Sequence, residues 1–265
     1  MDKQIFYAKN LNDVFSILKN NPGVKIIGGS TRIEEFPDKA ISTRNVKDLC
    51  QIVRHERYLD IGPGVSLAEM LEIGEKHLPP VLFQALSCIS NPFIRNLATL
   101  GGNICAEGQK LTLYAPLIAL DARLEFSSPN ETFSESIKNF KNIPNGFVLT
   151  NIRIPLNDVD LTIFRRIGPE HKITEDSASY AFMASIEKNS LMNVEIAFAG
   201  PFTFSSNSLE DSLIGRHLPF SQKDIQEIEE IVQSEFSKAA TDQMITDELR
   251  QQFLNLVRYS LEQLT

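Results

Sequence analysis

The sequence predicts an α+β protein in which mixed strands and helices come first and a sheet with helices follows. Three observations support this fold class: helix-capping residues precede amphipathic runs, the middle of the chain is rich in short extended segments, and two long amphipathic stretches close the sequence. With 265 residues, of which 42% are apolar and 23% charged, the chain can bury a core without disulfides.

The expected helix starts are identified by their capping residues. Asn10, Ser66, Ser221 and Thr246 each precede an apolar run, and an acidic residue follows each of them within the first turn. A side-chain oxygen at such a position accepts a hydrogen bond from a backbone N–H group that has no partner inside the helix. We therefore expect a helix to begin after each of these four residues.

The expected strands are short apolar or alternating runs separated by turn residues. Turns are expected at Pro22-Gly23, Gly62-Pro63-Gly64, Asn145-Gly146 and Lys188-Asn189-Ser190. The expected strands are residues 24–27, 58–61, 124–126, 147–154, 161–165, 177–187 and 194–199.

Charge and hydropathy exclude several classes of protein. The net charge is −8 and the basic residues are scattered, which argues against nucleic acid as a partner. No apolar run approaches the roughly 20 residues that span a bilayer. The first ten residues contain no apolar signal segment, so we expect a cytoplasmic protein without a membrane partner.

The three cysteines, Cys50, Cys88 and Cys105, form no CxxC pair. A disulfide framework, a metal site or an iron–sulfur cluster held by this chain alone is therefore not expected. Any such group that the protein works with should lie on a partner.

Two glycine pairs give the clearest functional signal. The first lies in Gly28-Gly29-Ser30-Thr31 directly after an expected strand, and the second lies in residues 98–103. Without Cβ atoms, successive N–H groups can converge on an anion, and a neighbouring hydroxyl adds a donor. Two such loops could hold the pyrophosphate of a dinucleotide such as FAD. Taken alone, however, a glycine pair more often marks a tight turn, and neither pair fits the Rossmann or P-loop pattern.

The second pair belongs to a longer motif. Residues 91–103 read NPFIRNLATLGGN and closely resemble the QIRNxATxGGN signature of FAD-binding subunits in the xanthine dehydrogenase and carbon monoxide dehydrogenase families. Residues 27–31 resemble the AGGTD loop of the same families. Weaker matches follow in the family's order at residues 60–65, 117–122, 152–155, 164–168, 196–200 and 213–215.

The resemblance implies a two-lobed, PCMH-like FAD-binding domain followed by a C-terminal α+β domain, with an antiparallel sheet and helices. The implied boundaries are residues 1–55 for the first lobe, 56–160 for the second lobe and 161–265 for the C-terminal domain.

The resemblance also assigns residues to FAD. They are Ile27, Gly28, Gly29, Ser30 and Thr31 in the first loop, and Thr99, Gly101, Gly102 and Asn103 in the second. Arg95 could face a phosphate, or it could pair with a carboxylate and hold the loop in place, and both interpretations stay open. No catalytic residue and no metal ligand is expected on this chain, because the redox chemistry would belong to the cofactor.

The sequence departs from the family at three places. Family members have a Pro, and then an Asp that hydrogen-bonds the flavin's sugar-like chain, where this sequence has Gln109 and Thr112. Thr112 retains a hydroxyl and is expected to contact FAD. Family arginines are absent at residues 169–171 and 204–207. These departures make the chain similar to the short flavin subunits proposed for selenate-reductase-like complexes.

The implied function is electron transfer in a molybdopterin dehydrogenase, a molybdenum-hydroxylase-type oxidoreductase. A molybdenum-cofactor subunit would transform the substrate, a [2Fe–2S] subunit would relay electrons, and FAD on this chain would exchange them with a soluble carrier such as NAD. Two alternatives stay open: an FAD-free scaffold subunit of such a complex, and a stand-alone two-lobed flavin oxidase.

Overall fold

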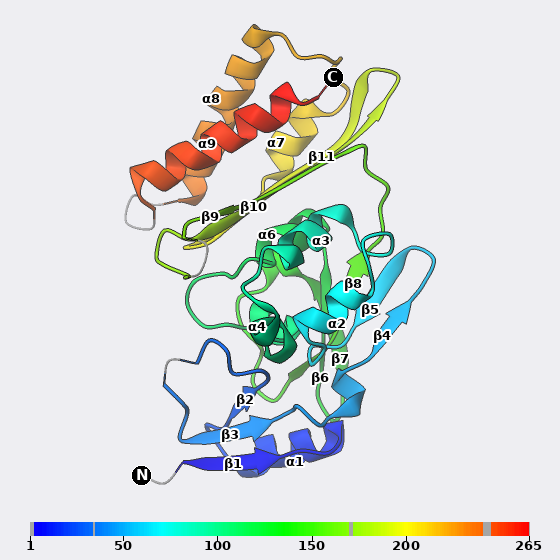
Figure 1. Ribbon diagram of the computed structural model, residues 1–265, viewed down its shortest axis with the longest axis vertical. Helices are drawn as coiled ribbons and strands as arrows, with labels where there is room; N and C mark the ends of the chain where they lie inside the picture. Colours follow the sequence, from blue (N-terminus) through cyan, green and yellow to red (C-terminus); the bar gives the residue numbers. More distant parts are fainter. Residues whose placement is uncertain (1–2, 34, 170–171, 241–244, 265) are drawn as a thin grey trace. The chain divides into compact units, whose positions relative to one another are not determined.

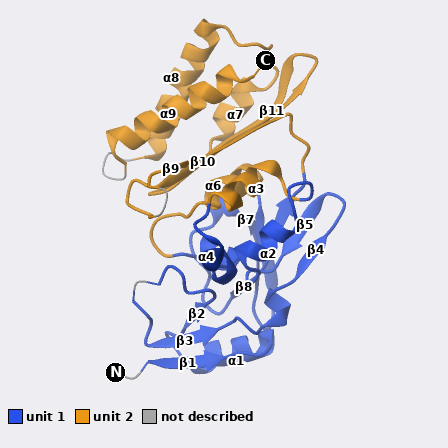
Figure 2. Ribbon diagram, in the orientation of Figure 1, with its two compact units in different colours: residues 1–77, 89–106, 121–156 blue, residues 78–88, 107–120, 157–265 orange. Residues whose placement is uncertain are grey.

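The computed structural model describes residues 3–33, 35–169, 172–240 and 245–264. The chain forms two compact units, and each is built from separate stretches of sequence (Figure 2). Unit 1 comprises residues 1–77, 89–106 and 121–156, and unit 2 comprises residues 78–88, 107–120 and 157–265. The division into domains at residues 55/56 and 160/161 stays a prediction.

Unit 1 contains a three-stranded parallel sheet in the order β1-β3-β2. Its strands are β1 (Gln4–Tyr7), β2 (Lys25–Ile27) and β3 (Lys39–Ser42). Helix α1 (Leu11–Asn20) begins after Asn10, whose side-chain oxygen accepts a hydrogen bond from the Asp13 N–H at 2.9 Å. Val14 of this helix and Ile41 of β3 are fully buried together. Because β2 ends at Ile27, the first glycine pair follows directly from the end of a strand.

The second sheet of unit 1 is antiparallel, with the order β4-β5-β8-β6-β7. Along β6, buried Leu124 and Phe126 alternate with more exposed neighbours, as expected when only one face of a sheet is covered. The strands are β4 (Ile52–Arg54), β5 (Tyr58–Ile61), β6 (Arg123–Ser127), β7 (Thr132–Ser136) and β8 (Val148–Pro155), and two 3₁₀ helices cover Lys47–Leu49 and Ile137–Asn139.

Three short helices complete unit 1, namely α2 (Leu67–Glu72), α4 (Pro92–Leu97) and α5 (Leu100–Ile104). Each begins after a side chain that accepts a backbone N–H: Ser66 for α2, Asn91 for α4 and Thr99 for α5. Helices of five or six residues are too short to be stable alone, so these caps and the packing around them fix their position.

Unit 2 is an antiparallel sheet with helices on both faces (Figure 1). The strands, in the order β12-β11-β10-β9, are β9 (Leu161–Ile167), β10 (Ala178–Glu187), β11 (Ser190–Ala199) and β12 (Thr203–Phe204). The helices α3 (Pro80–Ser87) and α6 (Tyr114–Ala119) cover one face, and α7 (Asn207–Leu213), α8 (Gln222–Ala239) and α9 (Asp247–Glu262) cover the other. Residues 178–184 of β10 are buried without interruption because both faces are covered.

Phenylalanine side chains form the centre of unit 2. The rings of Phe236 in α8 and Phe253 in α9 stack with their centroids 4.1 Å apart, and Phe198 of β11 contacts both rings edge-on. All three are essentially inaccessible to solvent. Within the described ranges, none of the helices has the length and apolar character that crossing a bilayer requires.

The predicted α+β class, including a C-terminal antiparallel sheet with helices, is confirmed. The helices expected after Asn10, Ser66, Ser221 and Thr246 are present. The last expected strand was too short, because β11 begins at Ser190 and not at residue 194. The turn before it consists of Lys188 and Asn189, which both have left-handed backbone angles.

An ion pair links β5 and β8 on the exposed face of the second sheet of unit 1. Asp60 and Arg153 are cross-strand neighbours, and the guanidinium donates to both carboxylate oxygens at 2.9 and 3.0 Å. His55 Nε2 lies 3.3 Å from the same carboxylate. Burial by itself would raise the pKa of Asp60, but hydrogen bonds from Arg153 and Asn151 and the nearby positive charge outweigh it, and the pKa is lowered.

We predict that Asp60→Asn lowers the free energy of unfolding by about 1 kcal/mol at neutral pH, because a bidentate ion pair is lost. Since the folded state lowers the pKa of Asp60, this stabilisation is present above the ordinary aspartate pKa of about 4 and is lost as the pH falls through the lowered value. Urea unfolding at about pH 7 and about pH 3 measures the difference. The exposed Asp211→Asn is the control, and a deficit in Asp60→Asn that persists at the acidic pH contradicts the charge-pair explanation.

Candidate functional site: two glycine loops

The first glycine loop, residues 28–31, leaves the end of β2. Ile27 is buried, and its carbonyl accepts hydrogen bonds from the Thr43 N–H at 3.2 Å and the Thr43 hydroxyl at 3.4 Å. Ser30 has a φ of 57°, in the left-handed region that non-glycine residues rarely adopt. The strand therefore fixes the start of the loop, and the loop then turns sharply at Ser30.

The second glycine loop, residues 99–103, opens α5. The Thr99 hydroxyl oxygen accepts a hydrogen bond from the Gly102 N–H at 3.1 Å, and the Thr99 carbonyl accepts one from the Asn103 N–H at 2.9 Å. The Gly101 N–H donates to the carbonyl of Pro63 at 2.8 Å. The N–H groups of Gly101, Gly102 and Asn103 are thus engaged within the protein itself.

The two loops touch each other although about seventy residues separate them in the sequence. A Cβ atom on Gly29 would lie 1.7 Å from the carbonyl oxygen of Leu97, and one on Gly28 would lie 2.8 Å from the Thr99 hydroxyl oxygen. No side chain can occupy the Gly29 position with this backbone. Gly29 is therefore required by a direct backbone approach, whereas Gly28 makes room for the Thr99 side chain.

The first loop contains backbone N–H groups that are available as hydrogen-bond donors. In the part of the chain that the structure describes, the N–H groups of Gly28, Gly29, Ser30 and Thr31 make no hydrogen bond to another residue. The loop is partly exposed, and its donors lie beside the Thr99 hydroxyl, whose proton is available because its oxygen acts as the acceptor for Gly102. Convergent backbone donors of this kind suit a phosphate group. These residues therefore fit a phosphate-bearing cofactor.

The side chain of Arg95, in α4, is bound to the segment that precedes this helix. Its guanidinium donates to the carbonyls of Ile89 at 2.8 Å and Ser90 at 3.0 Å. Of the two interpretations left open by the sequence, this contact agrees with the loop-holding role, although carbonyl groups take the place of the expected carboxylate. A direct contact between Arg95 and a phosphate stays a prediction.

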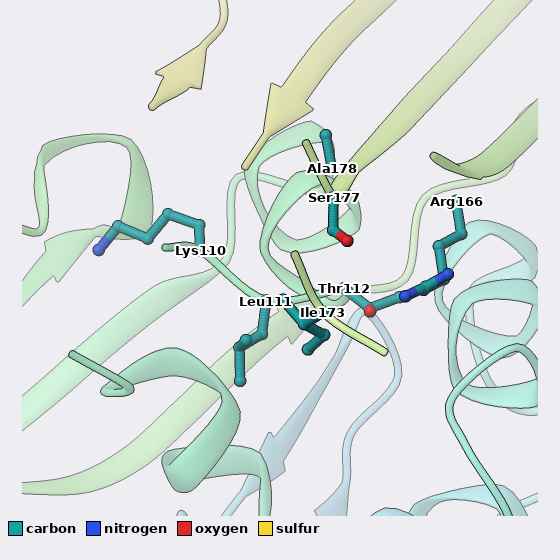
Figure 3. A pocket seen from close by; sticks show the side chains of 7 residues that line it. All are labelled: Lys110, Leu111, Thr112, Arg166, Ile173, Ser177 and Ala178. Carbon is teal, nitrogen blue, oxygen red and sulfur yellow. The ribbon is translucent and has the colours of Figure 1, made fainter. Parts of the chain in front are cut away.

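Thr112 and Gln109 belong to unit 2, whereas both glycine loops belong to unit 1. Thr112 lines a hollow with Lys110, Arg166 and Ser177 (Figure 3), whose volume of about 10 Å³ is at the lower limit for one water molecule. Gln109 donates to the carbonyl of Ser177. Of residues 169–171, where a family arginine is absent, Glu170 and His171 lie outside the described residues.

Arg166 is turned back on its own loop. Its guanidinium donates to the carbonyls of Gly168 at 3.3 Å, Lys172 at 2.9 Å and Pro169. At residues 204–207, where the other family arginine is absent, Ser206 caps α7 and donates to Glu235 at 3.1 Å. Near both positions where a family arginine is absent, other side chains thus form hydrogen bonds within this chain.

Sequence reasoning did not include the turn formed by residues 62–66 in the site. The carbonyls of Pro63 and Val65 accept hydrogen bonds from Gly101 and Leu100, at 2.8 and 2.9 Å. The Gly-Pro-Gly pattern identified a turn there, but no local pattern could indicate that the turn contacts a loop thirty-five residues away.

The paired loops thus fit a phosphate-bearing cofactor, with backbone N–H groups of the first loop as candidate donors. The chain belongs to the family described as "FAD binding domain in molybdopterin dehydrogenase", whose family model matches residues 1–157, more than half of the sequence. The match confirms the predicted family and its cofactor, FAD.

Curated relatives are similar at low identity. The chain is 27% identical over 186 residues to "Xanthine dehydrogenase FAD-binding subunit" of Escherichia coli O157:H7, a match that covers 66% of this chain and 61% of that protein. It is 21% identical over 230 residues to "Glyceraldehyde dehydrogenase medium chain" of Sulfolobus acidocaldarius, with 80% of each chain covered. The match to the first relative thus spans about three fifths of that protein's length.

Solved structures share the fold over almost the entire chain. A chain of the Cu,Mo-containing CO dehydrogenase superposes with a TM-score of 0.85 at 16% identity and covers 99% of this chain and 97% of its own length. A chain of quinoline 2-oxidoreductase from Pseudomonas putida 86 gives a TM-score of 0.81 at 17% identity, with coverages of 98% and 95%. At such identities the likeness establishes the fold.

We predict that Gly29→Ala prevents retention of FAD, because its methyl group would collide with the Leu97 carbonyl and force the two loops apart. The measurement is the ratio of FAD to protein after gel filtration. Gly23→Ala is the matched control in unit 1: Gly23 has a φ of 79° and no atom within 4 Å of its Cβ position, so the substitution is strained without touching the loops. A Gly29→Ala protein that retains about one FAD per chain contradicts the required approach.

Proposed function

We propose that this chain is the FAD-binding electron-transfer subunit of a molybdenum-hydroxylase-type oxidoreductase. In this role it passes electrons between the [2Fe–2S] clusters of a partner and a soluble carrier such as NAD. The observation that carries the proposal is the convergence of two glycine loops in unit 1, one of which has four backbone donors without a partner among the described residues. The family match to residues 1–157 supports the identity of the cofactor.

The proposed roles follow from the contacts of each residue. The N–H groups of residues 28–31 and the hydroxyls of Ser30 and Thr31 hold the pyrophosphate, since hydrogen bonds to a charged acceptor are each worth about 1.5–3 kcal/mol. Residues 99–103 form the facing wall, where Thr99 adds a hydroxyl and Asn103 an amide. FAD supplies the redox chemistry when bound. The protein's own part is to orient the cofactor and exclude water from its phosphates.

The partners are inferred from the relatives. Two structures similar to this chain are of CO dehydrogenases, one described as a Cu,Mo enzyme and the other as lacking the Mo-pyranopterin moiety of the molybdenum cofactor. Within the described ranges, this chain has no cluster of side chains suited to a metal ion. A molybdenum-cofactor subunit and a [2Fe–2S] subunit are therefore the partners that would complete an electron-transfer chain.

An FAD-free scaffold is the second candidate function. It is motivated by the uncharged Thr112 and by the structural contacts that replace the family arginines around Arg166 and Ser206. The four N–H groups of the first loop, which have no hydrogen-bond partner in the described part of the chain, favour the flavoprotein, because a scaffold does not need free donors there.

The experiment that tests the proposal is an absorbance spectrum of the purified chain, followed by chromatography of the cofactor released on denaturation. We expect flavin bands and about one FAD per chain. Bleaching of the flavin bands by NADH would support NAD as carrier. A colourless protein that stays colourless in excess FAD sinks the flavoprotein proposal and favours the scaffold.

We predict that Gly102→Val abolishes flavin retention. A Cβ atom at Gly102 would lie 3.0 Å from the Thr99 hydroxyl oxygen, and a branched side chain would both displace that hydroxyl and fill the approach to the loops. The same flavin-to-protein ratio measures the effect. A yellow, stoichiometric Gly102→Val protein counts against these loops as the phosphate site.

We predict that Thr112→Val weakens FAD binding about two- to tenfold, which corresponds to one neutral hydrogen bond of about 0.5–1.5 kcal/mol. Titration of FAD into the apoprotein gives the Kd. Thr203→Val is the matched control, because Thr203 is an exposed residue of β12 in the same unit. Equal affinities of the two variants would remove Thr112 from the site.

A further inference from the structure

The turn formed by residues 62–66 holds the second glycine loop in place through backbone hydrogen bonds. The carbonyl of Pro63 accepts the Gly101 N–H at 2.8 Å, and the carbonyl of Val65 accepts the Leu100 N–H at 2.9 Å. In the opposite direction, the Leu67 N–H donates to the carbonyl of Ala98 at 2.9 Å. Ser66 and Thr99 form an antiparallel bridge at the centre of these contacts. The conformation of the second loop therefore depends on that of the turn.

The turn is itself held firmly from its other side. The Gly62 N–H donates to the carbonyl of Gln51 at 2.8 Å, and the Gly64 N–H donates to that of Leu49 at 2.7 Å. A Cβ atom on Gly62 would lie 2.3 Å from the Leu49 carbonyl oxygen, so the approach is again one of backbone to backbone. Val65 is fully buried. The residues of the turn that precede it therefore have little freedom to move.

The end of the turn is held by a single side chain, Glu69. Its Oε2 atom accepts hydrogen bonds from both the Ser66 N–H at 2.8 Å and the Ser66 hydroxyl at 2.7 Å, and the Ser66 hydroxyl oxygen accepts the Glu69 N–H at 3.1 Å. This capping box starts α2. Glu69 is exposed and belongs to no buried core. Its structural influence is thus concentrated on Ser66, the bridge partner of Thr99.

We infer that Glu69 is a positioning residue for phosphate binding, acting through Ser66 and Thr99 on the second glycine loop. The inference rests on the proposed function, since it concerns the same FAD site. Without the Glu69 carboxylate, the Ser66 N–H and hydroxyl lose their acceptor, and the backbone at the bridge is held only by its hydrogen bonds to Ala98 and Leu100. The Thr99 hydroxyl is then held less firmly beside Gly28, although the hydrogen bonds of Glu69 described above all go to Ser66.

The experiment compares three variants by titration of FAD into the full-length apoprotein. Glu69→Ala removes the acceptor, and we expect a three- to tenfold higher Kd for FAD. Glu69→Gln keeps an oxygen that can accept from Ser66, so we expect its Kd to stay within about twofold of the wild type. Asp224→Ala is the matched control: Asp224 forms the same capping box with Ser221, at the start of α8 in unit 2.

Unfolding midpoints of the apoproteins separate positioning from general damage. Loss of either capping box lowers the midpoint to a similar extent, whereas only Glu69→Ala weakens FAD binding. A double variant, Glu69→Ala with Thr99→Ala, provides a second readout. Because Glu69 is inferred to act by placing the Thr99 hydroxyl, through Ser66 and its bridge to Thr99, the loss of affinity should be smaller than the product of the two single losses.

The outcomes distinguish the inference from the proposed function. If the wild type binds FAD and Glu69→Ala binds it as tightly as Asp224→Ala does, the inference is wrong and the flavoprotein proposal stands. If Glu69→Gln is as weak as Glu69→Ala, or if the effects with Thr99→Ala simply multiply, the capping route is wrong. If the wild type binds no FAD, the inference and the flavoprotein proposal are both wrong.

Discussion

The contact between Gly29 and the carbonyl of Leu97 is the constraint on which the site depends. It joins the loop after a parallel strand to the end of a short helix, with no side chain between the two backbones. A single methyl group at this point would separate the loops. This approach also places Gly28 beside the Thr99 hydroxyl, which is itself hydrogen-bonded to the Gly102 N–H.

The two loops have different tasks, although both contain a glycine pair. In the second loop the N–H groups of Leu100, Gly101, Gly102 and Asn103 are used inside the protein, so its shape is fixed before any ligand arrives. In the first loop the N–H groups have no protein partner among the described residues. A protein with a net charge of −8 can thus offer an anion a set of neutral donors.

The features that could be predicted from the sequence are those decided by residues close together in the chain. Capping residues such as Asn10 and Ser221 identified helices correctly, because a cap is decided by neighbours in the sequence. The short helices α3 to α6, and strands β1 and β3, were not predicted, because four to eight residues are too few to establish a period. Both glycine loops were recognised, but their contact, the carbonyl partners of Arg95 and the role of the 62–66 turn depend on long-range packing that no local pattern encodes.

The path of the chain limits how the protein can be divided. The second glycine loop lies in residues 89–106, and the segments on either side of it, with α3 and α6, belong to unit 2. Leu82, Leu86 and Leu117 of those helices are fully buried, with their packing partners supplied by a sheet that begins only at Leu161. A recombinant fragment ended at residue 157, the limit of the family match, would leave these helices uncovered and prone to aggregate. The segment that carries the second glycine loop is thus bounded at both ends by helices whose core is completed only by the C-terminal half of the chain.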